Sequence, residues 1–132
     1  MASKIKIEVN GTTWNANIVN NSSGVAFINL LKKGALQINM SDYGNFEKVG
    51  DLPENLPKND TNYSTKPGDI ILYLGKHITI YYDRNTWNFT KLGEIENVTQ
   101  AELKKVLEKE IVKSNLVYKF YIILKQIFII MV

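Results

Sequence analysis

The 132-residue chain contains no cysteine, one histidine, one arginine and three prolines. The absence of cysteine excludes disulfide bonds and thiolate metal sites. With His77 as the only histidine, a Cys/His/Asp triad and a multi-histidine metal site are both excluded within one chain. His77 falls in a predicted turn, where we interpret it as a solvated turn residue.

The sequence also lacks the short motifs that hold nucleotides or activate a serine. It has neither a glycine-rich phosphate loop nor a Gly-x-Ser-x-Gly elbow, so we expect no cofactor and no metal. The first ten residues lack the apolar segment of a secretory signal, and we therefore expect a cytoplasmic protein.

Net charge is absent over most of the chain, because basic and acidic residues balance there. Residues 1–99 hold ten basic and ten acidic side chains, and the formal net charge of +3 arises in residues 100–132, where six lysines accompany three glutamates. A neutral body matches the DNA backbone poorly, and Arg84 is the only arginine available to read guanine. We therefore expect no nucleic-acid partner.

Alternation of apolar and polar residues predicts a chain built mainly from β-strands. Asn10-Gly11, a strong hairpin signal, joins the first two predicted strands. Gly75-Lys76-His77 is predicted to join two apolar runs into a hairpin at the centre of the fold. The predicted strands cover residues 4–9, 12–19, 35–40, 46–52, 70–74, 78–82, 86–95 and 111–117.

Helical spacing of apolar residues predicts two helices, at residues 23–33 and 100–109. Thr99 and Glu102 are spaced as a capping box at the start of the second helix. Residues 53–67, which hold all three prolines, are predicted to be a long loop rather than a linker between two domains. The expected fold is one mostly antiparallel β-barrel over residues 4–117.

The last stretch, residues 118–132, is predicted to be an apolar extension outside that domain. It is shorter than the roughly 20 apolar residues of a membrane-spanning helix, and Lys119 and Lys125 interrupt it. It is typical of an extra strand or a packed terminal helix. The alternatives are an interfacial membrane anchor, which would make a membrane surface a partner, and a reading-frame artefact.

Two groups of side chains are candidates for chemistry. Four carboxylates, on Asp42, Glu47, Asp51 and Glu54, cluster around the fourth predicted strand and favour a solvated strand face over an acid–base or cation site. A second group consists of aromatic residues around the central hairpin, which suit the core or wall of a barrel and could also line a peptide groove: Tyr73, Tyr81, Tyr82, Trp87 and Phe89.

Several strings, in order along the chain, resemble the cyclophilin-like domain family and its small bacterial and archaeal members. These strings are the first hairpin, the first helix, MSDYGNFEKVGDLPENLP at residues 40–57, KPGDIILY at residues 66–73 and LGEIEN at residues 92–97. The resemblance implies a closed antiparallel barrel of about eight strands with a helix at each open end. The chain would then be an atypical relative of the peptidyl-prolyl isomerases.

The resemblance also implies where a groove would lie. True cyclophilins carry a catalytic arginine in a Phe-His-Arg stretch that falls here on Leu36-Gln37-Ile38, and Ile38 offers no donor. Lys48 falls at the glutamine of the family motif. If an atypical isomerase site exists, Gln37 or Lys48 would have to replace the arginine, although lysine lacks the guanidinium fork.

The expected function is non-catalytic binding of a peptide segment or small ligand in the cyclophilin-type groove. The residues expected to line that groove are Ile38, Met40, Phe46, Glu47, Lys48, Tyr73, Tyr82 and Trp87. Weak or atypical prolyl isomerisation is the enzymatic alternative, and a membrane-surface protein held by its C-terminal extension is the third.

Overall fold

The computed structural model describes residues 3–9, 11–43, 47–107 and 111–118. This part of the chain is mainly β with two helices, as predicted from the sequence. The elements in chain order are β1 (Ser3–Val9), β2 (Thr12–Ile18), α1 (Ser22–Lys32), β3 (Leu36–Tyr43), β4 (Glu47–Asp51), β5 (Thr61–Ser64), β6 (Asp69–Tyr73), β7 (His77–Tyr81), β8 (Thr86–Ile95), α2 (Gln100–Leu107) and β9 (Ile111–Tyr118).

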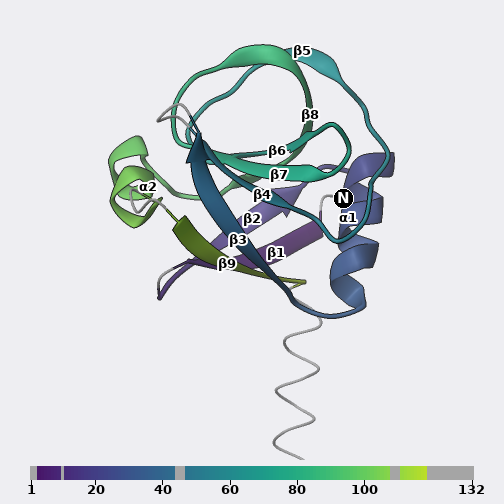
Figure 1. Cartoon of the computed structure of the whole chain (residues 1–132), viewed down its shortest axis with the longest axis horizontal. Coiled ribbons are helices and arrows are strands. Elements are labelled where there is room, and N and C mark those ends of the chain that lie inside the picture. The colour runs from purple at the N-terminus through teal and green to yellow at the C-terminus, as the bar shows by residue number, and fades with distance from the viewer. Residues whose placement is uncertain (1–2, 10, 44–46, 108–110, 119–132) are drawn as a thin grey trace, which may run out of the picture.

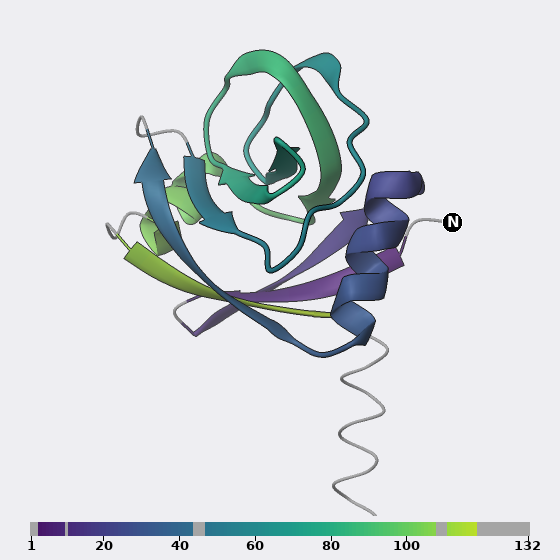
Figure 2. The same cartoon turned by 45° about the vertical axis from the view of Figure 1, so that its right-hand side comes forward.

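The strands form one strongly curved antiparallel sheet in the order β2-β1-β9-β3-β4-β7-β6-β8-β5. Curvature folds it into two layers, with β2, β1, β9 and β3 in one layer and β7, β6, β8 and β5 in the other (Figure 1; Figure 2). β4 links the layers because it pairs with β3 on one side and with β7 on the other. The result is a half-barrel with a core between its layers.

The predicted closure of the barrel is only partly realised. β2 meets β8 over three residue pairs, Ala16–Ile95, Asn17–Glu94 and Ile18–Gly93. The first residues of β8 leave this seam and pair with β5 instead. The sheet is therefore an open-sided half-barrel rather than a barrel closed along its whole length, which corrects the expectation drawn from the family resemblance.

β5 was not predicted, because residues 53–67 were assigned to a loop. Its four residues, Thr61–Ser64, are polar except for Tyr63 and show no apolar alternation. The strand forms because its backbone pairs with β8, and Tyr63 lies opposite Trp87. Such pairing is a tertiary contact, which local sequence does not report.

The remainder of the predicted loop is tied to the barrel by side-chain hydrogen bonds. Ser23 at the start of α1 donates to the Pro57 carbonyl (2.5 Å), and Asn59 Nδ2 donates to Ser23 Oγ (2.7 Å). Thr90 of β8 donates to Asp60 (2.6 Å). Hydrogen bonds of its polar residues therefore hold this segment in place, and burial of apolar side chains contributes little.

The core fills the space between the two layers and is closed at its ends by the helices. α1 begins at its cap Asn21, whose side chain accepts from the Gly24 N–H (3.0 Å), and buries Phe27 and Leu31. At the other end of the half-barrel α2 buries Leu103 and Leu107. Its start agrees with the predicted capping box, because the Glu102 N–H donates to Thr99 Oγ1 (3.2 Å).

The central hairpin, β6–β7, is present as predicted, but its turn lies one residue earlier. Leu74 and Gly75 both have positive φ (55° and 72°), as a type I′ hairpin turn requires, and His77 is already the first residue of β7. The turn holds the neighbouring loop, since Leu56 N donates to the Gly75 carbonyl (2.7 Å).

Of the predicted C-terminal extension, residues 119–132 lie outside the described residues, as does Phe46. β9 itself runs to Tyr118 and pairs with β1 and β3. Among the described residues, neither helix is long and apolar enough to cross a membrane.

Candidate ligand-binding pocket

Alternation along the central hairpin gives the half-barrel an inner and an outer face. Ile70 and Leu72 of β6, with Ile78 and Ile80 of β7, belong to the main core. The residues between them point the other way because successive side chains in a strand alternate. The outer face of this layer therefore carries its own set of residues and a small second cluster formed by Ile71, Tyr81 and Phe89, with Tyr63 packed against it.

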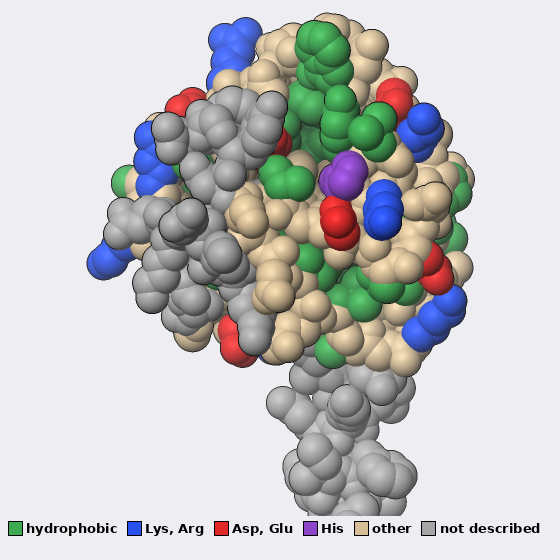
Figure 3. All heavy atoms as spheres, in the orientation of Figure 1, with side chains coloured by type: hydrophobic (Ala, Val, Ile, Leu, Met, Phe, Trp, Pro, Cys, Tyr) green, Lys and Arg blue, Asp and Glu red, His purple; other side chains and the backbone are tan. Residues whose placement is uncertain are grey.

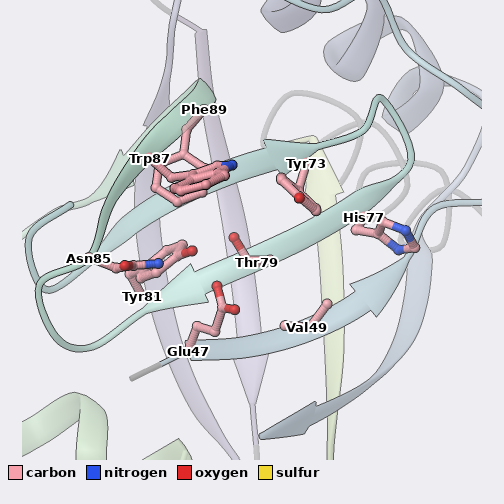
Figure 4. A pocket seen from close by; sticks show the side chains of 9 residues that line it. All are labelled: Glu47, Val49, Tyr73, His77, Thr79, Tyr81, Asn85, Trp87 and Phe89. Atoms are coloured by element: carbon pink, nitrogen blue, oxygen red, sulfur yellow. The ribbon is translucent and has the colours of Figure 1, made fainter. Parts of the chain in front are cut away.

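A cavity of about 420 Å³ opens on this outer face. Its lining comes from β4, β6, β7, β8 and the turn between β7 and β8, and consists of Glu47, Val49, Tyr73, His77, Thr79, Tyr81, Asn85, Trp87 and Phe89 (Figure 4). In the space-filling view, hydrophobic side chains gather around a hollow above the single histidine (Figure 3). The volume is within the range of small-molecule sites, which is roughly 300–1,000 Å³.

Aromatic side chains form the walls of the cavity. Tyr73 meets Phe89 edge-on with ring centroids 6.4 Å apart, and Phe89 meets Tyr81 at 5.6 Å. Trp87 is 61% exposed, and Figure 4 shows its ring across the cavity from Glu47. An exposed tryptophan beside an apolar hollow is typical of a contact surface, because it offers large apolar area with a polar tip.

A carboxylate lies at the base of these walls. Glu47 is the first residue of β4 and is only 7% exposed. The Tyr81 hydroxyl donates a hydrogen bond to Glu47 and accepts one from the Asn85 side chain. Burial, reinforced by the bond to Glu47, holds the pKa of Tyr81 well above its usual value.

Asn85 is positioned by the segment that follows β5. Thr65 N donates to the Asn85 carbonyl and Asn85 N donates to Thr65 Oγ1, both at 2.8 Å. Thr65 Oγ1 in turn donates to the Asp83 carbonyl (3.0 Å). The polar turn predicted at residues 83–85 thus becomes a fixed part of the cavity wall.

The rim of the cavity holds the histidine. His77 Nδ1 lies 2.5 Å from Asp51 Oδ1, in the register pair that joins the ends of β7 and β4. Its ring centroid is 6.4 Å from that of Tyr73. His77 is therefore a paired strand residue beside the cavity, which differs from the solvated turn position expected from the sequence.

A buried acidic residue fastens β5 and β8 beside the pocket. Asp69 is fully buried, and its carboxylate accepts from Tyr63 Oη (2.7 Å), Lys66 N (2.9 Å) and Lys66 Nζ (2.8 Å). Lys66 also bonds Glu94 (2.8 Å), and this bond lowers the pKa of the Glu94 carboxyl. Lys91 lies 5.3 Å from the centre of the Tyr63 ring.

The structure brings together three of the residues predicted to bind a ligand. Glu47, Tyr73 and Trp87 all line the cavity. Ile38, Met40 and Tyr82 lie elsewhere, since all three are buried in the main core. Tyr82 comes directly after Tyr81, the last residue of β7, and its side chain packs into the main core while that of Tyr81 lines the cavity.

The two residues considered for an atypical isomerase site are not among the lining residues. Gln37 is exposed on β3, on the other layer of the sheet. Lys48 pairs with Ile80 in the ladder between β4 and β7, and its side chain lies outside the described part of the structure. Arg84, the only arginine, is exposed in the turn before β8 and does not line the cavity.

Sequence reasoning left several lining residues out of the predicted site. The expected groove included residues of the region 73–87, but Thr79, Tyr81 and Asn85 were not named as lining residues; Val49 and Phe89 were not placed in it either. Strand alternation could have found three of them, because Val49 is two residues after Glu47, and Thr79 and Tyr81 are two and four residues after His77. The register of β4 against β7 places these side chains next to one another. Within the described residues no three His, Cys, Asp or Glu side chains form a metal-binding group.

The sequence profile of the Cyclophilin-like family matches residues 7–115, and the chain belongs to this family. No curated protein sequence is significantly similar to the chain.

Two solved structures are similar in fold. The solution structure of the hypothetical protein AF2241 from Archaeoglobus fulgidus has a TM-score of 0.60 at 12% identity, covering 89% of this chain and 95% of that one. McbB in complex with tryptophan has a TM-score of 0.59 at 14% identity, and the match covers 87% of this chain and 44% of McbB. At such identities the likeness concerns the fold alone.

Proposed function

We propose that this cyclophilin-like chain binds a small ligand or a peptide segment, without catalysis, in the outer-face pocket. The observation that supports the proposal most directly is a cavity of about 420 Å³ whose walls are aromatic and whose base holds a buried carboxylate. A mostly apolar hollow with a few convergent polar groups is the usual form of a ligand site.

The pocket is built on paired strands rather than on a free loop. Glu47 and Val49 of β4 lie opposite Tyr81 and Thr79 of β7 in an unbroken ladder. The opposite wall, β8, is held by β5 and by the Asp69 network. A pocket formed in this way is largely preformed, so little ordering of the protein opposes binding.

A thermal-shift screen with a pocket-filling variant tests the proposal. The panel contains small aromatic and aliphatic molecules, including tryptophan because McbB was solved with it, and short peptides with and without Xaa-Pro bonds. Val49→Phe places a larger side chain in the cavity lining. Val25→Phe makes the same change at a 49%-exposed position of α1, away from this cavity, and is the matched control.

Ligands that raise the melting temperature of the wild type and of Val25→Phe, but not of Val49→Phe, would support binding in the pocket. A panel with no stabilising member, or with ligands equally effective on Val49→Phe, would contradict the proposal. Hits that are Xaa-Pro peptides are then followed in a prolyl isomerisation assay. Turnover that is lost in a Gln37→Ala, Lys48→Ala double variant would contradict the non-catalytic part and favour an atypical isomerase.

A further inference from the structure

We infer that the pocket selects an organic cation, namely an ammonium group attached to an apolar body. This inference rests on the proposed function, since it specifies the ligand of the same pocket. It is carried by the placement of Glu47 beneath the rings of Tyr73, Tyr81, Trp87 and Phe89 (Figure 4).

Among the described residues, the cavity lining carries charge of one sign. Of the nine described residues that line the cavity, Glu47 is the only carboxylate, and none is lysine or arginine. The His77 ring at the rim is already engaged by Asp51. A carboxylate that is only 7% exposed has lost most of its hydration, and a charge-assisted hydrogen bond from a ligand ammonium would compensate for that loss.

The carboxylate is also held in place before any ligand arrives. Tyr81 donates to it, and Asn85 donates to Tyr81, so the hydroxyl is oriented from its far side. An ammonium brings three donors and no acceptor, which matches the acceptor character of Glu47. A neutral alcohol offers a single donor and no charge, so it would compensate the carboxylate less well.

The aromatic walls favour the same class of ligand. A cation over the face of a tryptophan or tyrosine ring is attracted by the electrons of the ring, and the attraction grows when the site is desolvated. Trp87 is 61% exposed and Tyr73 is 37% exposed, so both rings are accessible from the cavity mouth. The body of the ligand would contact Phe89 and Val49.

A hard metal cation suits this lining poorly. Calcium takes about 6–8 oxygen ligands, and magnesium requires nearly octahedral oxygen coordination. In the described part of the chain, the lining offers a single carboxylate among the four aromatic rings of Tyr73, Tyr81, Trp87 and Phe89. An ammonium on an aromatic or aliphatic amine, or on a lysine side chain of a peptide, has the matching chemistry.

The test compares a cation with its neutral counterpart on the full chain. The probes are 2-phenylethylamine and 2-phenylethanol, with N-acetyl-lysine-N-methylamide added to represent a lysine side chain. Binding is measured at pH 7 by calorimetry and by tryptophan fluorescence, to which the exposed Trp87 contributes alongside the buried Trp14, with Ca²⁺ and Mg²⁺ as separate arms. Glu47→Gln removes the charge and nearly preserves the shape, while Glu54→Gln makes the same change on an exposed loop residue.

The wild type is expected to bind the amine about tenfold or more tighter than the alcohol. Glu47→Gln should abolish that preference and Glu54→Gln should keep it. Trp87→Leu changes an exposed residue outside the core. It should lower the affinity for the amine more than the affinity for the alcohol. It keeps the test decisive if Glu47→Gln unfolds. The ratio of affinities for the lysine derivative and the free amine distinguishes a peptide source from a free amine.

Equal binding of amine and alcohol, unchanged in Glu47→Gln, would overturn the inference while leaving the proposed pocket in place. Tighter binding of Ca²⁺ or Mg²⁺ than of either amine would also overturn it. If neither these probes nor any member of the wider panel binds, it is the proposed function itself that fails.

Discussion

Gly50 decides how closely β3 and β4 approach each other. A Cβ at this position would lie 2.4 Å from Ile38 Cγ2 and 2.8 Å from the Asn39 carbonyl oxygen. Cβ atoms in proteins do not come this close to other atoms, so the two strands would have to move apart. Glycine in a strand interior often marks such a close approach of another backbone.

Gly50→Ala is therefore expected to destabilise the fold by about 1–3 kcal/mol, the usual cost of overpacking. Urea denaturation followed by circular dichroism would measure the change in the free energy of unfolding. A loss below about 0.5 kcal/mol, the range of an ordinary surface substitution, would show that β3 and β4 do not meet as described.

At the residue scale the sequence predicts side-chain type better than side-chain direction. Glu47 was chosen because it lies in a string that carries the family resemblance, and Trp87 because it is one of the aromatic residues near the central hairpin; both line the pocket. Ile38 and Met40 were assigned to a groove through a family motif, and the structure buries both in the core. Strand alternation separates two faces, but it does not say which face packs inward, so the direction of these side chains required the three-dimensional pairing.

The elements that border the pocket depend on Asp69. Its carboxylate receives three hydrogen bonds at 2.7–2.9 Å, from the Tyr63 hydroxyl of β5 and from the backbone and side chain of Lys66. Because Asp69 is the first residue of β6, these bonds fasten β5 and the segment after it to the central hairpin.

Asp69→Asn should lower the free energy of unfolding by about 2–4 kcal/mol, because it removes the charge of a fully buried acceptor and replaces one of its oxygens with an amide NH₂ group that cannot accept. Chemical denaturation of both variants measures the difference. Glu54→Gln is the control: it removes an exposed carboxylate 3.7 Å from Lys33 and should cost less than about 0.5 kcal/mol. Equal losses in the two variants would contradict the structural role of Asp69.

At the element scale the helices and most strands were predicted close to their observed limits. α1 and α2 carry apolar residues at helical spacing next to capping side chains, so local sequence suffices. β5 was missed because its residues are polar and its formation depends on β8. The turn of the central hairpin was displaced because Leu74, a residue that seldom has positive φ, adopts 55° there.

For the whole molecule, the seam between β2 and β8 could not be read from the chain. Gly93 permits it, since a Cβ there would lie 2.2 Å from the Asn17 carbonyl oxygen. Because β8 divides its ten residues among β2, β6 and β5, the barrel stays open along one side. The family resemblance correctly predicted a mainly antiparallel β fold with two helices. Its closed barrel was wrong, because the resemblance could not specify how β8 is shared.

Stability of the whole molecule should fall above about pH 10. Burial, with the hydrogen bond to Glu47, raises the pKa of Tyr81 above its unfolded value of 10.0. Burial alone would lower the pKa of Lys66, but its hydrogen bonds to Asp69 and Glu94 raise it. The unfolded chain therefore releases these protons first, and the free energy of unfolding decreases as the pH rises through the folded-state pKa values.

Wild type and Tyr81→Phe are compared by denaturation between about pH 8 and pH 11. Both should lose stability because Lys66 is retained, but the wild type should lose it more steeply. Parallel curves would show that Tyr81 is not held in its neutral form by burial and by Glu47.

Mapping a bound amine by NMR shows whether a ligand occupies the outer face formed by β4, β7, β6 and β8. The ¹⁵N-labelled 132-residue chain is titrated with 2-phenylethylamine, and chemical-shift changes are followed by NMR. We predict that the changes concentrate on the backbone amides of Tyr73, Thr79 and Tyr81 and on the Trp87 indole N–H. Saturable changes confined to α1 or to β1 and β2, with this pocket unaffected, would show that the amine binds elsewhere and that the outer-face pocket is not the ligand site.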